Sequence, residues 1–309
     1  MISTPVITIV GFGNIGSTIS MMLLHDEVVD WQINIMEPSR KRRGRIEDFL
    51  HTSPLFPFRS IKFNSKKLLR DSDFVIFAAG GKGKIREDRT EVMAETIRIT
   101  KEFFSSFSFN NKGARVIVVT NPVDVICYHV KRNTNLSANQ IIGTGTYLDT
   151  IRMNYYLSKQ MKVTPAAVSA MVLGEHGNTM VPILSQIRLD GRKVPHKKLN
   201  INDIMDKTRN AAFNIKRTED ATVYGISACA YRIVHMLLNP PPGFIVPLSM
   251  QITPYYKKLL NVKRNIFLGL PVIFHDIGRP YHVLELKLNS AEQKLMAKSA
   301  QKIEKLTRS

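Results

Sequence analysis

The sequence predicts an α/β protein, with a doubly wound parallel sheet in its first half and an α+β domain in its second. Short apolar runs rich in β-branched residues alternate with helical spacing up to about residue 146, and then the alternation stops. The 309 residues fit two modest domains better than one small core. Hydrophobic residues make up 44% and charged residues 22%, which excludes a disordered or fibrous chain. We therefore expect two domains, residues 1–146 and 147–309.

The first half reads as a series of strands that each end at a turn or a polar residue. The run from Val6 to Val10 is apolar on both faces, as a buried parallel strand must be, and it ends at Gly11. Helical spacing follows it at Ile15 and Ile19. Further strands are expected at 33–36, 73–79, 115–120 and from 141, with a helix over 91–104. Strands that alternate with helices at this spacing favour a parallel sheet.

The second half lacks this alternation. Helices are expected over 148–162, 208–216 and 222–238, and strands over 166–172, 245–250, 266–270 and 283–288. The run 239–243, with three consecutive prolines, is a hard stop. A closing amphipathic helix over 290–307 has Ser290 as its expected N-cap and Glu292 in its first turn. This mixture indicates an α+β domain without a second phosphate-binding loop.

Composition narrows the partners and the compartment. The two cysteines, Cys127 and Cys229, can build neither a disulfide framework nor a four-thiolate metal site, so we expect a reducing cytoplasm and no metal. The sequence has no run of 18 apolar residues and no signal peptide, which argues against a membrane protein. The net charge of +19 attracts anions. Because the basic residues do not form one block, we favour a spread over solvated faces and expect no specific nucleic-acid partner.

A dinucleotide site is indicated by the run from Gly11 to Gly16, which has the pattern G-x-G-x-x-G between a strand and a helix. In this pattern the glycines allow a tight turn, close approach of a pyrophosphate and close packing of the helix, whose free N–H groups face the phosphates. Glu37 ends the second strand, where a carboxylate binds the ribose hydroxyls and favours NAD over NADP. Arg40 and Arg42 follow soon after Glu37, and an arginine pairs well with a 2′-phosphate, so NADP stays open as an alternative cofactor. The cofactor-binding residues expected here are Gly11, Gly13, Asn14, Ile15, Gly16, Glu37 and Arg42.

Five polar residues stand at the carboxyl ends of expected strands or on the element that follows, where an open α/β sheet places its ligand. They are Arg89, Asn121, Asp149, Arg152 and His176. Asp149 and Arg152 are three residues apart, so they share one face of a helix. Each has an ordinary explanation on its own, as a helix ion pair or a surface histidine. Together they favour an acid/base site that binds an anion.

Four motifs occur in order along nearly the whole chain: the glycine turn 11–16, Thr-Asn-Pro-Val-Asp at 120–124, Gly-Thr-Gly-Thr-Tyr-Leu-Asp-Thr-Ile-Arg at 143–152, and Leu-Gly-Glu-His-Gly at 173–177. In these motifs the chain resembles the lactate/malate dehydrogenase superfamily, and most closely its NAD-dependent L-lactate and L-2-hydroxyacid dehydrogenases. The resemblance implies a Rossmann domain followed by an α+β substrate domain, with NAD as cofactor. It also implies a 2-oxo or 2-hydroxy acid as substrate, and a homodimer or homotetramer.

The resemblance also assigns roles to single residues. It implies that His176 exchanges the proton, that Asp149 orients its imidazole, and that Arg152 binds the substrate carboxylate as a fork. It implies that Arg89 lies on a loop that closes over the substrate and polarises the reacting carbonyl. The remaining residues that it places at substrate or cofactor are Asn121, Thr222, Gly80, Gly81, Thr120 and Ile226.

One position departs from the family pattern. The residue six before the loop arginine reads the substrate side chain in this family, where it is usually Gln in lactate enzymes and Arg in malate enzymes; here it is Gly83. A glycine offers no partner for a second carboxylate, so we expect a lactate-type enzyme. Two alternatives stay open: a malate dehydrogenase that uses Lys82, Lys84 or Arg86, and a non-catalytic Rossmann protein that senses NAD or binds another anion or nucleic acid.

Overall fold

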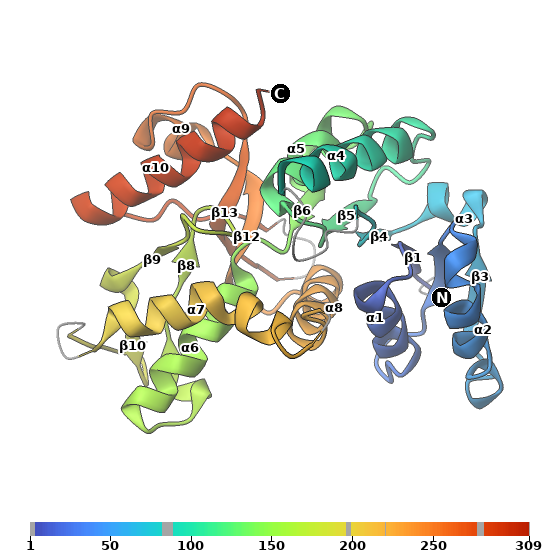
Figure 1. Cartoon of the computed structure of the whole chain (residues 1–309), viewed down its shortest axis with the longest axis horizontal. Coiled ribbons are helices and arrows are strands. Elements are labelled where there is room, and N and C mark those ends of the chain that lie inside the picture. The colour runs from blue at the N-terminus through green and yellow to red at the C-terminus, as the bar shows by residue number, and fades with distance from the viewer. Residues whose placement is uncertain (1–3, 82–88, 196–198, 220, 277–280, 309) are drawn as a thin grey trace. The chain divides into compact units, whose positions relative to one another are not determined.

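The computed structural model describes residues 4–81, 89–195, 199–219, 221–276 and 281–308 (Figure 1). The chain forms two compact units. The first contains Met1–Gly143 and Val223–Leu238, and the second contains Thr144–Thr222 and Asn239–Ser309. The domain boundary at residue 146, which was expected from the sequence, stays a proposal. The sequence did not predict that Val223–Leu238 would belong to the first unit.

The first unit is built on a parallel sheet. Its strands are β1 (Val6–Val10), β2 (Gln32–Met36), β3 (Ser60–Phe63), β4 (Phe74–Phe77), β5 (Arg115–Val118) and β6 (Ile141–Gly143). They lie in the order β3-β2-β1-β4-β5-β6, and each neighbouring pair is parallel. Ile7 of β1 is level with Ile33 of β2 and with Phe74 of β4, and all three are buried. The doubly wound parallel sheet expected from the sequence is thereby confirmed.

Most helices of this unit lie between these strands in the sequence, and one, α8 (Tyr224–Leu238), comes from much later in the chain. The helices are α1 (Asn14–Leu24), α2 (Arg43–Leu50), α3 (Lys66–Asp71), α4 (Arg89–Ser105), α5 (Val123–Arg132) and α8, together with the short 3₁₀ helices η1 (Arg40–Arg42), η2 (Ser53–Leu55) and η3 (Ala138–Gln140). The sequence did not predict β3, α2, α3 or α5. Lys62 of β3 is exposed and the other residues of that strand are only half-buried, so the strand lacks the continuous apolar run of a central one.

The late helix α8 packs beside α1 and is fixed to the first unit by a buried carboxylate (Figure 1). Asp26 Oδ2 accepts a hydrogen bond of 2.7 Å from Trp31 Nε1, and His235 Nε2 lies 2.7 Å from the same oxygen. Burial raises the pKa of Asp26, but the hydrogen bonds from Trp31 and the Val28 N–H and the nearby His235 outweigh it and lower that pKa. The carboxylate therefore stays charged and joins α8 to the start of β2.

A buried histidine, His129, lies in α5 without such a hydrogen-bond partner among the described residues. Burial, and then the charges of Lys101 and Arg132, lower the pKa of His129 to about 4. Neither ring nitrogen makes a hydrogen bond among the described residues, and the side chain is only 4% exposed. His129 is therefore neutral near pH 7 and serves the packing of α5.

The second unit mixes helices with short antiparallel strands. Its helices are α6 (Tyr147–Met161), α7 (Ile201–Lys216), α9 (Pro254–Leu259) and α10 (Ser290–Leu306), with η4 (Pro165–Ala167) and η5 (Leu184–Gln186). Its strands are β7 (Val168–Ser169), β8 (Val172–Leu173), β9 (Val181–Pro182), β10 (Arg188–Leu189), β11 (Arg192–Lys193), β12 (Ile245–Gln251), β13 (Phe267–Ile273) and β14 (His282–Val283). β12, β13 and β14 pair in that order, antiparallel. This confirms the α+β character expected from the sequence.

Two expected strands of this unit are wrong in extent. The strand expected over 166–172 is interrupted, because the Ala170 N–H donates to Asn154 Oδ1 (2.9 Å) instead of joining a ladder. The strand expected over 283–288 ends at Val283. Beyond it, the Leu286 N–H donates to the hydroxyl of Tyr256 (3.0 Å), so a side chain takes the place of a neighbouring strand.

Two helix starts also differ from expectation. The cap of α10 is Asn289 rather than Ser290, because the Asn289 side chain accepts from the Glu292 N–H (2.9 Å) and Glu292 accepts from the Asn289 N–H (3.1 Å). The helix expected from residue 208 begins at Ile201, where Asn200 caps it. In both cases an asparagine side chain satisfies an N–H group that has no partner within the helix.

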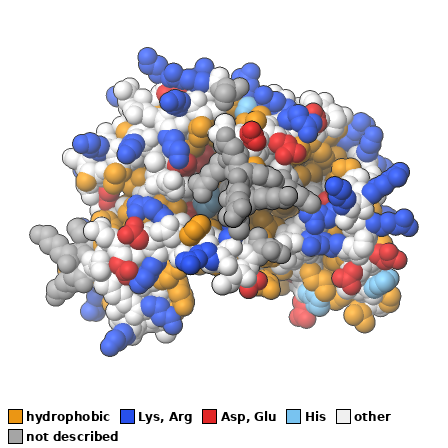
Figure 2. All heavy atoms as spheres, viewed as in Figure 1, with side chains coloured by type: hydrophobic (Ala, Val, Ile, Leu, Met, Phe, Trp, Pro, Cys, Tyr) orange, Lys and Arg blue, Asp and Glu red, His pale blue; other side chains and the backbone are white. Residues whose placement is uncertain are grey.

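The surface charge is distributed. On the face seen in Figure 2, Lys and Arg side chains occur in several separate places rather than in one block. This agrees with the expectation that the excess of 44 Lys and Arg over 25 Asp and Glu covers solvated faces. No helix within the described residues is both long and apolar enough to cross a membrane.

Candidate active site

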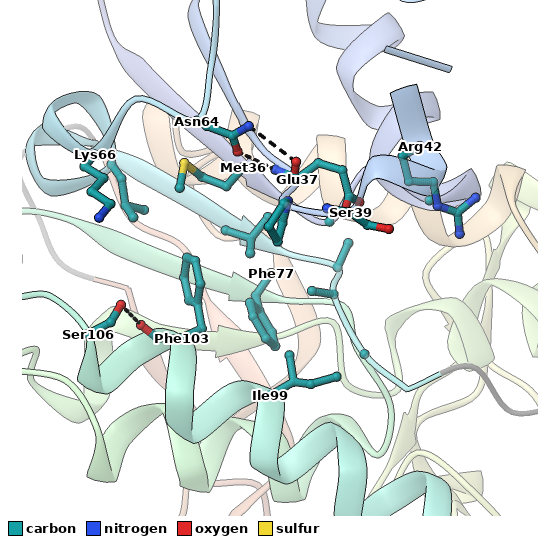
Figure 3. Close-up of a pocket in the computed structure, with 18 of the residues that line it drawn as sticks. Met36, Glu37, Ser39, Arg42, Asn64, Lys66, Phe77, Ile99, Phe103 and Ser106 are labelled. Atoms are coloured by element: carbon teal, nitrogen blue, oxygen red, sulfur yellow. Dashed lines mark hydrogen bonds between the residues drawn. The ribbon is translucent and has the colours of Figure 1, made fainter. Parts of the chain in front are cut away.

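The first unit contains a cavity of about 780 Å³ at the carboxyl ends of its central strands. The cavity has two different sides (Figure 3). Phe77, Ile99 and Phe103 form an apolar side, and Glu37 and Arg42 lie on the polar side. Gly11, Gly13, Ala79 and Gly80 also line it. An apolar slot beside a polar wall at this edge of the sheet suits a flat ring with a sugar and phosphates attached.

The glycine turn fits a dinucleotide. Gly11 has a φ of +90°, and a Cβ there would lie 2.8 Å from Cα of Ala79, so only glycine allows β1 to turn here. A Cβ on Gly16 would collide with the carbonyl oxygen of Gly11. Gly13 precedes α1 as its N-cap, and no described side chain caps the helix. The N–H groups at Asn14, Ile15 and Gly16 are thus left for a ligand, and the helix end favours an anion.

The acid expected at the ribose lies beside this turn. Glu37 Oε2 accepts a hydrogen bond from the Phe12 N–H (2.8 Å), and Oε1 accepts one from the Ser39 N–H (2.9 Å). Each carboxylate oxygen keeps a free lone pair for a ribose hydroxyl. The Arg42 guanidinium lies near Gly13, since its Nη2 would be 3.8 Å from a Cβ placed on that glycine. One acid and one cation therefore flank the place where the adenosine half would bind.

Further expected cofactor residues lie at the ends of the next two strands. Thr120, just beyond β5, donates its hydroxyl to the carbonyl of Ala79 (2.7 Å) beyond β4. A Cβ on Gly80 would lie 2.8 Å from the Thr120 methyl group, so Gly80 and Thr120 are immediate neighbours. The Gly81 N–H donates to the Thr96 hydroxyl of α4 (3.0 Å). Asn121 follows Thr120 and is exposed. The structure thus gathers these four residues of the first unit at one edge of the sheet.

The second unit brings together the three residues expected to bind and protonate a substrate. His176 Nδ1 lies 2.6 Å from Asp149 Oδ2, and Arg152 Nη1 lies 3.4 Å from Asp149 Oδ1. The Asp149 side chain is only 1% exposed, whereas those of Arg152 and His176 are 14% and 24% exposed. Because a carboxylate only accepts hydrogen bonds, Nδ1 carries the proton toward Asp149, which sets the tautomer of the His176 imidazole. The arrangement can hold an anion and exchange a proton next to it.

Hydrogen bonds between α6 and β8 produce this pairing across 27 positions of the sequence. The Thr146 hydroxyl donates to the carbonyl of Val172 (2.6 Å), and the Val172 N–H donates to the Thr150 hydroxyl (2.9 Å). Asp149 lies between these two threonines in the sequence, in the first turn of α6, and His176 follows three residues after the end of β8. The two threonines therefore fix the first turn of α6 against the strand that leads into the histidine loop.

The remaining expected residues are placed less completely. Arg89 is the first residue of α4 rather than part of the preceding loop, and its side chain is outside the described part of the chain. Gly83, Lys82, Lys84 and Arg86 also lie outside the described residues. Ile226 lies in the first turn of α8 in the first unit, half-buried, and Thr222 is the last residue of the second unit's first segment.

The cavity also has lining residues that the sequence did not single out. Ser39, Lys41, Asn64, Lys66 and Ser106 line it. Asn64 accepts a hydrogen bond from the Glu37 N–H (2.9 Å) through its side chain, as Figure 3 shows. Asn64 and Lys66 follow β3, the edge strand that the sequence did not predict. Recognition of that strand would have placed both residues at the carboxyl edge of the sheet, beside Glu37.

No group of three or more His, Cys, Asp or Glu side chains that could hold a metal ion occurs within the described ranges. The residues that are gathered instead suit organic anions and a dinucleotide.

The first unit contains a glycine turn with its acid, and the second contains a paired imidazole and carboxylate. These features define a class of protein: an NAD-binding oxidoreductase with a separate acid/base unit. Comparison with known proteins agrees. The family profile described as lactate/malate dehydrogenase, NAD binding domain, matches residues 6–143, and the profile of the alpha/beta C-terminal domain matches residues 146–308. The chain belongs to the lactate/malate dehydrogenase family.

Its relatives extend over nearly its full length. It is 31% identical over 312 residues to an L-lactate dehydrogenase of Fervidobacterium nodosum, which covers 97% of this chain and 96% of that protein. It is 28% identical over 302 residues to an L-lactate dehydrogenase 1 of Staphylococcus aureus, covering 95% and 93%.

Solved structures show the same fold. A minor L-lactate dehydrogenase from Enterococcus mundtii matches with a TM-score of 0.86 at 24% identity, covering 99% of this chain and 98% of that one. A lactate dehydrogenase from a Medee basin deep-sea metagenome matches with a TM-score of 0.84 at 26% identity, covering 98% and 97%.

Proposed function

We propose that the chain is an NAD-dependent L-2-hydroxyacid dehydrogenase of the lactate type, which interconverts a 2-oxo acid and an L-2-hydroxy acid. The observation that carries this is the contact of 2.6 Å between His176 Nδ1 and the buried Asp149, with Arg152 on the same side of α6. The L-lactate dehydrogenases among its relatives support the same reaction.

Three side chains of the second unit have separate roles in the proposed reaction. Arg152 holds the substrate carboxylate through two parallel hydrogen bonds, which fixes the position of the carbonyl beside it. His176 presents Nε2 to the carbonyl oxygen, donates a proton as negative charge develops there, and recovers it in the reverse direction. Asp149 holds the imidazole in one tautomer and stabilises its charged form. Bound NADH supplies the hydride in the direction of reduction.

Other residues have proposed roles that follow the family. Arg89 polarises the carbonyl together with His176, and Asn121 helps to place substrate and cofactor. Thr222 lies beside the substrate and Ile226 against the nicotinamide. We also propose a homodimer or homotetramer in the cytoplasm, with a small organic acid as the only specific partner besides the cofactor.

The decisive experiment is NADH oxidation with a panel of 2-oxo acids. Turnover with pyruvate or its longer homologues supports the proposal. Turnover mainly with oxaloacetate would favour the malate dehydrogenase alternative. NADH binding without turnover of any 2-oxo acid would favour a protein that only senses NAD, although a sensor has no need of the paired His176 and Asp149.

We expect a strong preference for NADH over NADPH, of about 100-fold in kcat/KM, because the Glu37 carboxylate would face a 2′-phosphate at close range. Steady-state kinetics with both cofactors measures it. Glu37→Gln should reduce the preference, whereas Arg42→Gln should weaken both cofactors because Arg42 lies beside the glycine turn. Equal kcat/KM values for the two cofactors in the unchanged protein would show that the nearby arginines override the acid.

We expect oxaloacetate to be a much poorer substrate than pyruvate, because Gly83 offers no partner to a second carboxylate, whose burial without one is costly. Longer apolar acids such as 2-oxobutyrate should be accepted about as well as pyruvate, since each buried methylene returns roughly 0.8 kcal/mol. Gly83→Arg should raise oxaloacetate turnover relative to pyruvate, as the ratio of the two kcat/KM values measures. A native preference for oxaloacetate would show that Lys82, Lys84 or Arg86 sets the specificity instead.

A further inference from the structure

The loop that carries His176 is attached to the closing helix α10 through the residue next to the histidine. The Glu175 N–H donates to the Ser299 hydroxyl (2.7 Å), and Lys302 Nζ lies 2.5 Å from Glu175 Oε1. Ser299 and Lys302 are three residues apart on α10, so both face the loop. The backbone and the side chain of Glu175 are therefore both fixed to the same helix.

The Glu175 carboxylate also closes the loop on itself. Its Oε2 accepts the Thr179 N–H (3.2 Å) and the Thr179 hydroxyl. On the other side, Gly174 exchanges two backbone hydrogen bonds with Gly269 of β13 (2.9 and 3.0 Å). The segment from Gly174 to Thr179 is thus held at both ends, and His176 lies between the two attachments.

Glu175 is buried, at 8% exposure, and needs a cation. Lys302 is the one Lys or Arg that the described part of the chain places in ion-pair contact with it. Removal of one partner of such a pair leaves the other charge buried and uncompensated. The Lys302 side chain is 39% exposed, so its loss creates no cavity and need not unfold the protein.

We propose that Lys302 is a positioning residue for proton transfer: it neutralises and holds Glu175, and thereby keeps the His176 imidazole aligned with Asp149. This inference rests on the proposed function, because it takes His176 as the group that exchanges the proton. Lys302 touches neither substrate nor cofactor in this scheme and acts through Glu175.

The charges that the described residues place around His176 set the direction of the expected effect. Asp149 and Arg152 face it from α6, Glu175 precedes it in the loop, and Lys302 balances Glu175 from α10. If Lys302 is replaced by an uncharged residue, the negative charge of Glu175 acts on the imidazole without compensation. Negative charge nearby favours the protonated imidazole, so the titration of His176 should move to higher pH.

The test compares Lys302→Met with Lys298→Met, which removes one charge from an exposed position of the same helix. In Lys302→Met we expect kcat for pyruvate reduction to fall about tenfold, because a misaligned proton donor slows the chemical step. KM for pyruvate and for NADH should change less than about twofold, since Arg152 and the glycine turn are untouched. The falling limb of the pH profile of kcat/KM should move upward by about half a unit. Lys298→Met should have the same kcat and pH profile as the unchanged protein. Lys302→Arg, which keeps the positive charge, should have nearly normal values of both.

A readout without turnover separates this inference from the proposed function. NMR of the histidine rings, with the His176 signal identified by its loss in His176→Gln, follows the titration of that imidazole directly. An upward shift in Lys302→Met and none in Lys298→Met supports the positioning role even if no 2-oxo acid is reduced, a result that would overturn only the proposed function. An unchanged His176 titration together with a kcat within twofold of normal would overturn the inference, and so would a fall in kcat without any shift of the titration.

Discussion

Replacement of His176 by Asn should abolish turnover while leaving NADH binding nearly unchanged. Asparagine is close in size and can still face Asp149, which lies 2.6 Å from the imidazole, but it cannot exchange a proton. Loss of an acid/base group typically costs about 10²–10⁴-fold in rate, which corresponds to about 3–5 kcal/mol of transition-state stabilisation. The cofactor residues from Gly11 to Gly16 belong to the other unit and do not depend on this side chain.

Steady-state kinetics with pyruvate and a fluorescence titration with NADH measure the two quantities separately. His51→Asn is a matched control, because His51 is exposed at the end of α2. That control should keep normal kinetics. If His176→Asn retained more than half of the normal activity, the proton would have to come from another group and the role of His176 would be wrong.

Replacement of Arg152 by Lys should raise KM for pyruvate about 100-fold, although the charge is kept. A guanidinium offers two parallel N–H donors to a carboxylate, whereas an ammonium is a single point charge. Arg152 also contacts Asp149 at 3.4 Å, so a lysine would have to choose between the buried acid and the substrate. The expected loss is about 2.7 kcal/mol of substrate binding, and the dissociation constant of NADH should not change.

The measurement is a substrate saturation curve at fixed, saturating NADH. Arg209→Lys provides the comparison, because Arg209 on α7 forms an exposed ion pair with Asp206 at 3.6 Å and has no part in the site. A rise in KM of less than about threefold in Arg152→Lys would show that the carboxylate is held by charge alone.

The parts of the site that the sequence predicts well are those made by neighbours in the chain. The turn from Gly11 to Gly16 is local, so its pattern alone indicates why each glycine is needed, and the structure agrees. The proximity of Asp149 and His176 is different, because it depends on threonine hydrogen bonds to Val172 that no local pattern announces. The sequence pattern placed both residues at the ligand-binding edge of the sheet, but only the family resemblance predicted that Asp149 holds the His176 imidazole.

The parts that the sequence missed depend on weak strands and on side-chain hydrogen bonds. β3 is half-exposed and has no long apolar run, so Asn64 and Lys66 beyond it were not seen as part of the cavity. The interruption at Ala170 arises because Asn154, sixteen residues earlier, takes its N–H. Such substitutions of a side chain for a neighbouring strand are decided in three dimensions and leave no periodic signal.

The place of α8 in the first unit has a consequence for how the protein is made. The parallel sheet is complete in sequence once Gly143 has been synthesised, but the helix that packs on α1 and pairs His235 with Asp26 ends only at Leu238. At roughly 5–20 residues per second, the ribosome needs roughly 5–20 seconds more to supply it. During that interval Trp31 and Asp26 lack their late partner, while the second unit's first segment is already emerging. The nucleotide-binding unit therefore lacks one of its helices until Leu238 has been synthesised, and a fragment that stops at Gly143 would lack the helix whose His235 contacts Asp26.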